Sequence, residues 1–188
     1  MFFDIPAQYL EEAHIYELLE VNSPSYIQVI AKEKGRAQEC LVAASKYFDI
    51  SPFIMQAVKD HENGEIGSAN GAAGGSKDYG PYQINTVFLD ELNQQHNISW
   101  KSLSYSACIN AFVGGSILKQ RIKLASNVWE GVGNYHYNIK KSPLIHYSYR
   151  LKVLKVYRSL LKDKMSFEKI EFRNKYKSKT DDPNYANN

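Results

Sequence analysis

The sequence predicts a mainly α-helical fold, and three observations support this prediction. Apolar residues recur along most of the chain at the i, i+3, i+4, i+7 spacing that marks one face of an amphipathic helix. No segment alternates apolar and polar residues convincingly, so we expect little or no sheet. The 188 residues are 44% hydrophobic and 23% charged, a globular balance that fits one folded core with short extensions.

Start and stop signals mark the expected helices. Pro24 follows a break at Asn22-Ser23, and Ser51-Pro52 is typical of an N-cap followed by proline at the first helical position. Gly64 is expected to end the helix that begins at Pro52. In order, we expect helices over residues 6–21, 25–34, 37–48, 52–63, 81–95, 106–125, 128–135 and 146–161.

Two stretches of the chain depart from this simple pattern. Residues 65–80 are rich in Gly, Ser, Ala and Asn and predict a long loop, which in a compact domain is often functional. The helix over residues 106–125 is apolar on more than one face, which predicts burial on all sides. Gly114-Gly115 in its middle would be costly unless another element approaches closely there. We divide the chain into an N-terminal helical extension (1–35), a central domain (36–161) and a polar, flexible tail (162–188).

Charge and composition exclude several functions. The net charge is +3, and no basic stripe is interleaved with stacking aromatic residues, so we expect no nucleic-acid partner. The five histidines show no metal-ligand spacing, so we expect no metal. No stretch approaches the roughly 20 apolar residues of a membrane span, and no signal peptide is visible at the N-terminus. The sequence leaves open whether a leader was removed or the protein leaves the cytosol by another route.

Glu62 is the residue that the helical pattern does not explain. It follows Ile54, Ala57 and Val58 on the apolar stripe of its helix, with His61 beside it. A buried carboxyl group resists ionisation, and its pKa rises toward the range that a general acid needs near neutral pH. The alternative is a glutamate at the helix end that reaches water or is neutralised by a neighbour.

Two later segments carry side chains suited to sugar recognition. Residues 78–85 contain Tyr82, Gln83 and Asn85, and residues 134–137 contain Tyr135. Amide groups pair with hydroxyl and acetamido groups, and aromatic rings pack on pyranose faces. The alternatives are a core role for Tyr135 and a solvated position for Gln83.

These segments, in this order, resemble the lytic transglycosylase family with the soluble-lytic-transglycosylase, lysozyme-like fold, in the branch associated with secretion, conjugation and pilus systems. The motifs that carry the resemblance lie between Cys40 and Tyr137. They are Glu62-Asn63-Gly64, Gly75-Ser76-Lys77-Asp78, Gly80-Pro81-Tyr82-Gln83-Ile84-Asn85, Cys108-Ile109-Asn110-Ala111 and Asn134-Tyr135-His136. Asn63 stands where the family has serine, and Pro81-Tyr82 stand where it has Leu-Met.

The resemblance implies a lysozyme-like helical domain with a long substrate-cleft loop and an enzyme without cofactors. Glu62 would be the single acid and base that cleaves the β-1,4 bond between N-acetylmuramic acid and N-acetylglucosamine of peptidoglycan, with formation of a 1,6-anhydro ring. Gln83 would bind the sugar, Tyr135 would hold Glu62 through its hydroxyl, and Tyr82 would offer a stacking surface. Asn85 and Ser76 are further candidates for substrate binding or acid orientation.

The resemblance also implies partners and a compartment. We expect the protein in the periplasm or cell envelope, acting on glycan strands and serving components of a transenvelope machine. Cys40 and Cys108 lie on helices that pack together in this fold, where they could form a disulfide or remain two buried thiols. The basic tail could guide the protein toward the anionic wall or a partner, or could simply be solvated.

The sequence leaves two other functions open. One is a lysozyme-like hydrolase, such as a phage enzyme, which would need a second carboxylate. The nearest acids are Asp60, which points elsewhere on the helix, Glu65 in the loop, and Asp78, which we expect to pin the loop to the next helix. The other is a non-catalytic peptidoglycan-binding scaffold that kept the fold.

Overall fold

The computed structural model describes residues 3–71 and 73–180, and within them the fold is mainly helical, as the sequence predicts. The helices are α1 (Ala7–Leu10), α2 (Ala13–Glu17), α3 (Pro24–Tyr47), α4 (Pro52–Glu62), α5 (Leu89–His96), α6 (Trp100–Tyr105), α7 (Ala107–Lys123), α8 (Val128–His136) and α9 (Pro143–Thr180). Two short 3-10 helices are η1 (Ala73–Gly75) and η2 (Thr86–Phe88).

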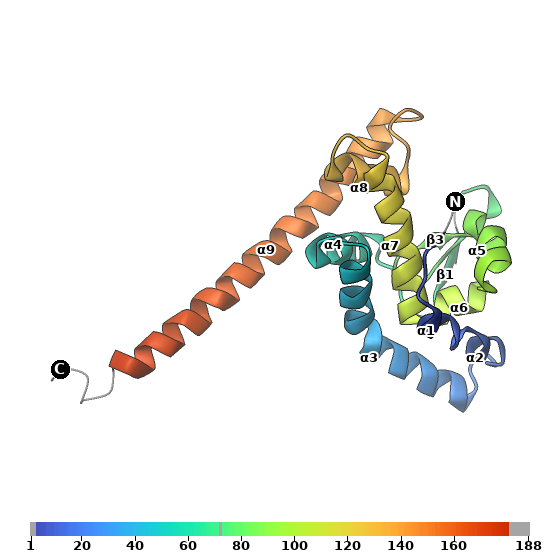
Figure 1. Cartoon of the computed structure of the whole chain (residues 1–188), viewed down its shortest axis with the longest axis horizontal. Coiled ribbons are helices and arrows are strands. Elements are labelled where there is room, and N and C mark those ends of the chain that lie inside the picture. Colours follow the sequence, from blue (N-terminus) through green and yellow to red (C-terminus); the bar gives the residue numbers. More distant parts are fainter. Residues whose placement is uncertain (1–2, 72, 181–188) are drawn as a thin grey trace.

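Helix α7 is the centre of the fold, and α3, α6 and α8 pack against it (Figure 1). Every residue from Ala107 to Leu118 is buried, which confirms the prediction of a helix enclosed on all sides. Its N-terminus is capped by Ser106, whose hydroxyl accepts a hydrogen bond from the N–H of Ile109. Helices α3 and α8 contact α7, and α9 contacts both α4 and α8.

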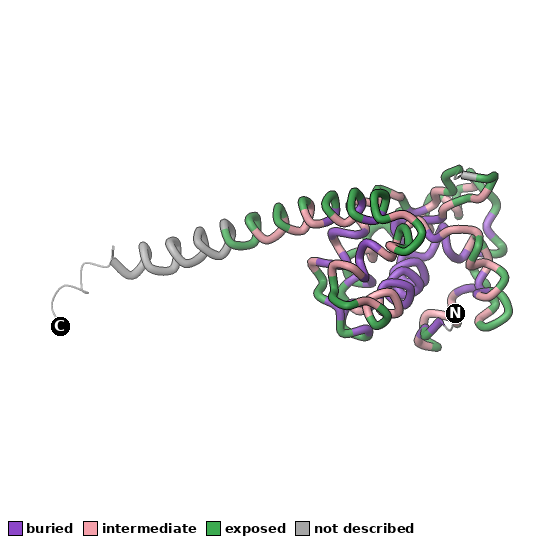
Figure 2. Tube along the Cα trace, turned by 90° about the horizontal axis from the view of Figure 1, so that it is seen from above, coloured by how far each residue is buried: buried purple, intermediate pink, exposed green. Residues whose placement is uncertain are grey.

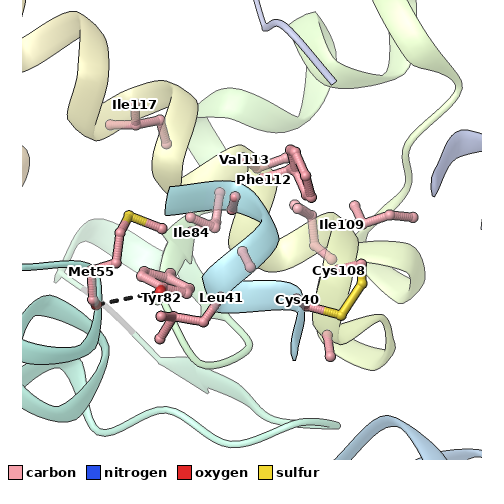
Figure 3. Close-up of a cluster of buried hydrophobic side chains, with 14 of the residues drawn as sticks. Cys40, Leu41, Met55, Tyr82, Ile84, Cys108, Ile109, Phe112, Val113 and Ile117 are labelled. Atoms are coloured by element: carbon pink, nitrogen blue, oxygen red, sulfur yellow. Dashed lines mark hydrogen bonds between the residues drawn. A yellow bond between two sulfur atoms is a disulfide. The ribbon is translucent and has the colours of Figure 1, made fainter. Parts of the chain in front are cut away.

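The two glycines in α7 allow close packing, as their position predicts. A methyl group at Gly114 would lie 2.7 Å from the ring of Tyr82, and one at Gly115 would lie 2.7 Å from the ring of Phe48. Both distances are shorter than any van der Waals contact. Figure 3 shows the tightly packed core around Tyr82, with Met55, Leu41 and Ile84 close by. Glycine is therefore retained in α7 because aromatic side chains pack directly on its backbone.

The predicted loop over residues 65–80 contains most of a small antiparallel sheet. Its strands are β1 (Ala69–Gly71), β2 (Lys77–Tyr79) and β3 (Ile84–Asn85), in the order β1-β2-β3. Ala69 pairs with Tyr79, and Asp78 pairs with Asn85. Strands of two or three residues are too short to show a recognisable alternation in the sequence.

Four expected helices differ from those in the structure. The helix expected from Pro81 is wrong: Gly80 and Gln83 have φ angles of 65° and 47°, which make a turn into β3, and α5 begins only at Leu89. The pieces expected on either side of Gly35 are one helix, α3, and an ion pair of 3.0 Å between Glu33 and Arg36 spans that position. The first expected helix is divided into α1 and α2, and α6 was not expected.

Helix α9 extends well beyond the rest of the molecule (Figures 1 and 2). It passes the boundary expected at residue 161 and is helical as far as Thr180. Its first part contributes buried residues, including His146, Tyr149 and Val153, whereas residues 154–165 are half-buried or exposed (Figure 2). The expected tail thus includes helix, and its last eight residues lie outside the described part of the chain.

Cys40 of α3 and Cys108 of α7 form a disulfide, 68 residues apart in the sequence (Figure 3). Of the two alternatives that the sequence leaves open, the structure has the bridge. It joins the two helices whose contact forms much of the core. A cross-link that closes a long loop stabilises the fold mainly by restricting the unfolded chain.

We predict that replacing both cysteines by serine lowers the free energy of unfolding by about 3–5 kcal/mol, because the unfolded chain loses the constraint of a long closed loop. Urea denaturation followed by circular dichroism measures this change. The wild-type protein treated with a reductant should approach the stability of the double variant. Equal stability of oxidised, reduced and doubly substituted protein would contradict this prediction.

Candidate active site

Glu62 lies at the C-terminal end of α4, facing a cleft. The helix ends at Asn63, which has a left-handed backbone conformation with φ 52° and ψ 29°. Asparagine tolerates this conformation better than most residues. The departure from the family pattern at this position therefore fits the backbone geometry of the helix end, and the exposed Asn63 side chain is not required to support Glu62.

Two adjoining hollows make up the cleft, and Glu62 and His136 line both of them. The Arg121 hollow has a volume of about 580 Å³ and is lined by residues of β2, β3, η2, α7, α8 and the segment after α8. The Tyr149 hollow has a volume of about 550 Å³ and is lined by residues of α4, α8 and the first part of α9. The Glu62 carboxyl group thus sits where the two hollows meet.

Burial is the main influence on Glu62. It raises the pKa of this carboxyl group from 4.5 to about 7, because a charged carboxylate is poorly solvated there. A hydrogen bond from Tyr149 opposes the shift, and the negative charge of Asp78 adds to it. Glu62 is therefore divided between its protonated and ionised forms near neutral pH, as a group that must give and take a proton requires.

Tyr149 of α9 holds the Glu62 carboxyl group directly. Its hydroxyl donates a hydrogen bond of 2.6 Å to Glu62 Oε1, and its ring is 5% exposed. His136 stacks on this ring at 4.8 Å with an angle of 7° between the ring planes, and His61 meets it edge-on at 4.9 Å. The two histidines keep the tyrosine ring in one orientation.

Both histidines are biased toward the neutral form. Burial lowers the pKa of His61 and of His136, and the positive charge of Lys152 lowers each further. The negative charge of Asp78 opposes the shift of His136 in part. A neutral imidazole offers little electrostatic stabilisation to an ionised Glu62. The histidines therefore leave the raised pKa of Glu62 in place while they position Tyr149.

Tyr149 takes the role that the sequence assigned to Tyr135, and this assignment is corrected. The hydroxyl of Tyr135 donates to the backbone carbonyl of Tyr82 at 2.8 Å, while Tyr135 still lines the Arg121 hollow. Tyr149 was missed because it lies 87 residues from Glu62 in the sequence, in a helix that reads as an ordinary amphipathic segment. Only the packing of α9 on α4 brings the two side chains together.

The prediction that Tyr82 offers a stacking surface to the substrate is also wrong. Its side chain is 1% exposed, it packs on Gly114, and its hydroxyl donates to the carbonyl of Met55 at 3.3 Å (Figure 3). The ring is part of the core. An aromatic residue that does line the cleft is Tyr137, which is 38% exposed and lies in the segment that the sequence singled out.

Gln83 lies in the cleft, close to the end of α4. Its Nε2 donates to the carbonyl of Gly80 at 2.8 Å, and its Oε1 accepts from Asn70 at 2.9 Å. A methyl group at Gly64 would lie 2.1 Å from the Gly80 carbonyl and 2.4 Å from Gln83 Nε2. Gly64 is therefore needed for a second reason beyond ending α4, since it lets the turn of Gln83 approach Glu62.

Ser76, Asp78 and Asn85 form a linked group on the sheet side of the cleft. Asn85 Nδ2 donates to Asp78 Oδ1 at 2.7 Å and to Ser76 Oγ at 3.2 Å, and all three residues line the Arg121 hollow. Asp78 does not pin a helix start, as was expected, but joins β2 to β3. It also lies near enough to Glu62 to affect its pKa.

Asn110 holds the turn that precedes Gln83, a role that the sequence by itself did not reveal. Its side chain is fully buried in α7. It donates to the carbonyls of Tyr79 and Leu103 at 2.9 and 3.0 Å, and its Oδ1 accepts from the N–H of Tyr82 at 2.8 Å. These bonds fix the turn that carries Gln83 onto the central helix.

Across residues 3–71 and 73–180, no three His, Cys, Asp or Glu side chains gather as a metal site. In the same residues, no helix has both the length and the apolar character needed to cross a bilayer.

Fold and site together define a mainly helical domain with a cleft centred on one buried carboxyl group. No protein-family model matches the chain. The chain is 33% identical to Invasion protein IagB of Salmonella typhimurium over 126 residues, which cover 65% of this chain and 77% of that protein. The IagB of Salmonella typhi matches equally. Protein IpgF of Shigella flexneri is 30% identical over 103 residues, which cover 54% of this chain and 66% of that protein. The chain belongs to the family of Invasion protein IagB.

We predict that Tyr149→Phe raises the pKa of Glu62 above about 7, because the ionised carboxylate loses the donor that favours it. An NMR titration of the Glu62 side-chain carboxyl carbon measures this value. Tyr147→Phe is the matched control, since Tyr147 lies on the same helix but is 42% exposed. A Glu62 pKa that is unchanged or lower in Tyr149→Phe would show that the hydrogen bond does not act on the ionised form.

Proposed function

We propose that this protein is a peptidoglycan lytic transglycosylase, which cleaves the β-1,4 bond between N-acetylmuramic acid and N-acetylglucosamine and closes a 1,6-anhydro ring. The observation that carries the proposal is the position of Glu62, a carboxyl group with a pKa of about 7 where the two hollows of an open cleft meet. A glycan strand that fills both hollows places one glycosidic bond beside this group. The resemblance of the motifs between Cys40 and Tyr137 to lytic transglycosylases supports the same reaction.

In the first step, protonated Glu62 gives its proton to the glycosidic oxygen, and the bond from that oxygen to C1 of N-acetylmuramic acid breaks. The acetamido oxygen of the same sugar stabilises C1. In the second step, ionised Glu62 takes the proton of the C6 hydroxyl, whose oxygen bonds to C1. Each step transfers one proton, Glu62 ends as it began, and the reaction consumes no water and no cofactor. A pKa near 7 serves both steps, because neither protonation state is strongly disfavoured.

The remaining residues of the cleft position the acid and the sugar. Tyr149 orients Glu62 through its hydroxyl, and Tyr135 supports the turn at Tyr82. Gln83, Asn85 and Ser76 present amide and hydroxyl groups to the substrate from the sheet side. Tyr137 provides an aromatic surface for a sugar ring.

We infer the setting from the family and from the disulfide. The relatives include proteins named for invasion, and a disulfide is typical of an oxidising compartment such as the periplasm. Local opening of the cell wall for a transenvelope secretion machine accounts for both the relatives named for invasion and the disulfide. The partners would be glycan strands and components of that machine.

A lysozyme-like hydrolase is the second candidate, and Asp78 is the observation that favours it. Asp78 and Glu62 line the same hollow, and a pair of carboxyl groups flanking the substrate is what hydrolysis commonly needs. The direct bond from Asn85 to Asp78 weighs against this role, because it holds the carboxylate in the sheet.

We predict that Glu62→Gln lowers the release of fragments from purified sacculi by at least about 1,000-fold, because glutamine cannot supply the proton. Chromatography of the soluble products measures the rate. Glu65→Gln is the matched control, since Glu65 is exposed in the loop after α4 and should keep full activity. Equal release by wild type and Glu62→Gln would rule out the enzyme proposal, and sacculus binding without release by either would favour a scaffold.

The products of Asp78→Asn separate the two enzyme candidates. A transglycosylase should keep forming anhydro-muropeptides. As the pH is raised, the Asp78→Asn variant should lose activity at a lower pH than the wild type, because removal of the Asp78 charge lowers the pKa of Glu62. Mass spectrometry distinguishes anhydro ends from reducing ends. Reducing-end products in the wild type that disappear in Asp78→Asn would identify a hydrolase instead.

A further inference from the structure

Two cations lie in the Arg121 hollow together with Glu62. Arg121 belongs to the last turn of α7, and Lys141 follows α8 in the segment that leads to α9. These elements meet because α8 packs on both α7 and α9. The two positive charges therefore come from distant parts of the sequence and face one cavity.

Neither cation has an ion-pair partner among the residues that the structure describes. The Nε of Arg121 is buried and also has no hydrogen-bond partner. Arg36 shows the contrasting case, because its guanidinium pairs with Glu12 at 2.9 Å and with Glu33 at 3.0 Å. Buried donors are nearly always paired in folded proteins, and the half-buried Arg121 keeps this Nε donor available to a group supplied from outside the chain.

The acids of the same hollow offset these charges only in part. Asp78 contributes one negative charge, which acts on Glu62, and Glu62 is largely protonated at slightly acidic pH. Two cations facing one charged acid leave the hollow with a net positive charge toward its ligand. A neutral polysaccharide has no group that would balance this charge, whereas an anionic one does.

Neighbouring side chains add donors of the same kind. The amide oxygens of Asn134 and Asn138 accept from the N–H groups of Ile139 and Lys140. This leaves the NH₂ groups of both asparagines as donors, and both residues line the hollow. A site made of a guanidinium, an ammonium and two amide NH₂ groups suits a ligand that only accepts hydrogen bonds, such as a carboxylate.

We propose that Arg121 and Lys141 form a carboxylate-binding subsite of the cleft, which makes the protein selective for glycans that carry an acidic side arm. The inference rests on the proposed function and specifies its substrate class. In peptidoglycan the carboxylate comes either from the peptide attached to the lactyl arm of N-acetylmuramic acid or, where that peptide has been removed, from the lactyl arm itself. The two sources share one chemistry, and an uncharged chitin-type glycan lacks it.

Binding to the inactive variant Glu62→Gln tests the subsite without any need for catalysis. Isothermal titration calorimetry would use three ligands: soluble peptidoglycan fragments with their peptides, the same fragments after an amidase has removed the peptides, and chitohexaose. Arg121→Gln and Lys141→Gln are each introduced into this background. Lys123→Gln and Lys140→Gln are the matched controls, because both residues are exposed, lie one or two positions away and do not line the hollow.

We expect Arg121→Gln and Lys141→Gln each to weaken binding of the acidic glycans about 5- to 10-fold, with chitohexaose binding and both controls changed less than 2-fold. Arg121→Lys, which keeps the charge, should retain most of the affinity. A loss confined to the amidase-treated fragments assigns the lactyl carboxylate, because the amidase frees it from its amide bond to the peptide. A loss confined to peptide-bearing fragments assigns the peptide carboxylates, and a loss in both shows that the subsite accepts either carboxylate.

Equal weakening for all three ligands, or equal effects in the controls, would overturn the subsite. Circular dichroism confirms that each variant is folded. Failure of the proposed function is recognised separately, because it appears as product release that does not depend on Glu62. The binding comparison remains valid in that case, since it uses no turnover.

Discussion

The buried amide of Asn110 holds together the elements that build the cleft. It satisfies three backbone groups of neighbouring segments, at Tyr79, Tyr82 and Leu103, from a position in the fully enclosed helix α7. An irregular turn can lie against a helix in the core only if its polar backbone groups find partners there. Because Asn110 supplies them, Tyr82 can enter the core and Gln83 can face the cleft from the adjacent position.

Glu62 depends on this arrangement for its chemistry. A carboxyl group at the end of an isolated α4 would be solvated and would ionise well below neutral pH. In the folded protein, burial raises its pKa to about 7, the negative charge of Asp78 adds to the rise, and the hydrogen bond from Tyr149 opposes it. The acid is thus made by long-range packing, chiefly by α9 on α4, and the disulfide between α3 and α7 stabilises the core that supports this packing.

The cations of the protein differ in whether the chain itself supplies their partners. Ion pairs such as that of Arg36 stabilise the fold because both partners belong to the chain. Arg121 and Lys141 form no such ion pair among the described residues, and both line the hollow that contains Glu62. In the proposed subsite, they leave the ligand a charge to balance.

The sequence by itself determined the helical class, the buried central helix, the end of α4 and the choice of Glu62, because each depends on local propensity or on the period of apolar residues. It also placed Gln83, Asn85 and Ser76 in segments that do line the cleft. It could not assign the partner of Glu62 or the location of the Tyr82 ring, and it read the turn at Pro81 as a helix start. Those features were decided by the tertiary structure alone, since Tyr149 and Asn110 act across 87 and up to 31 residues of chain. Contacts at such separations leave no periodic signal in a single sequence, because they depend on which helix faces pack together.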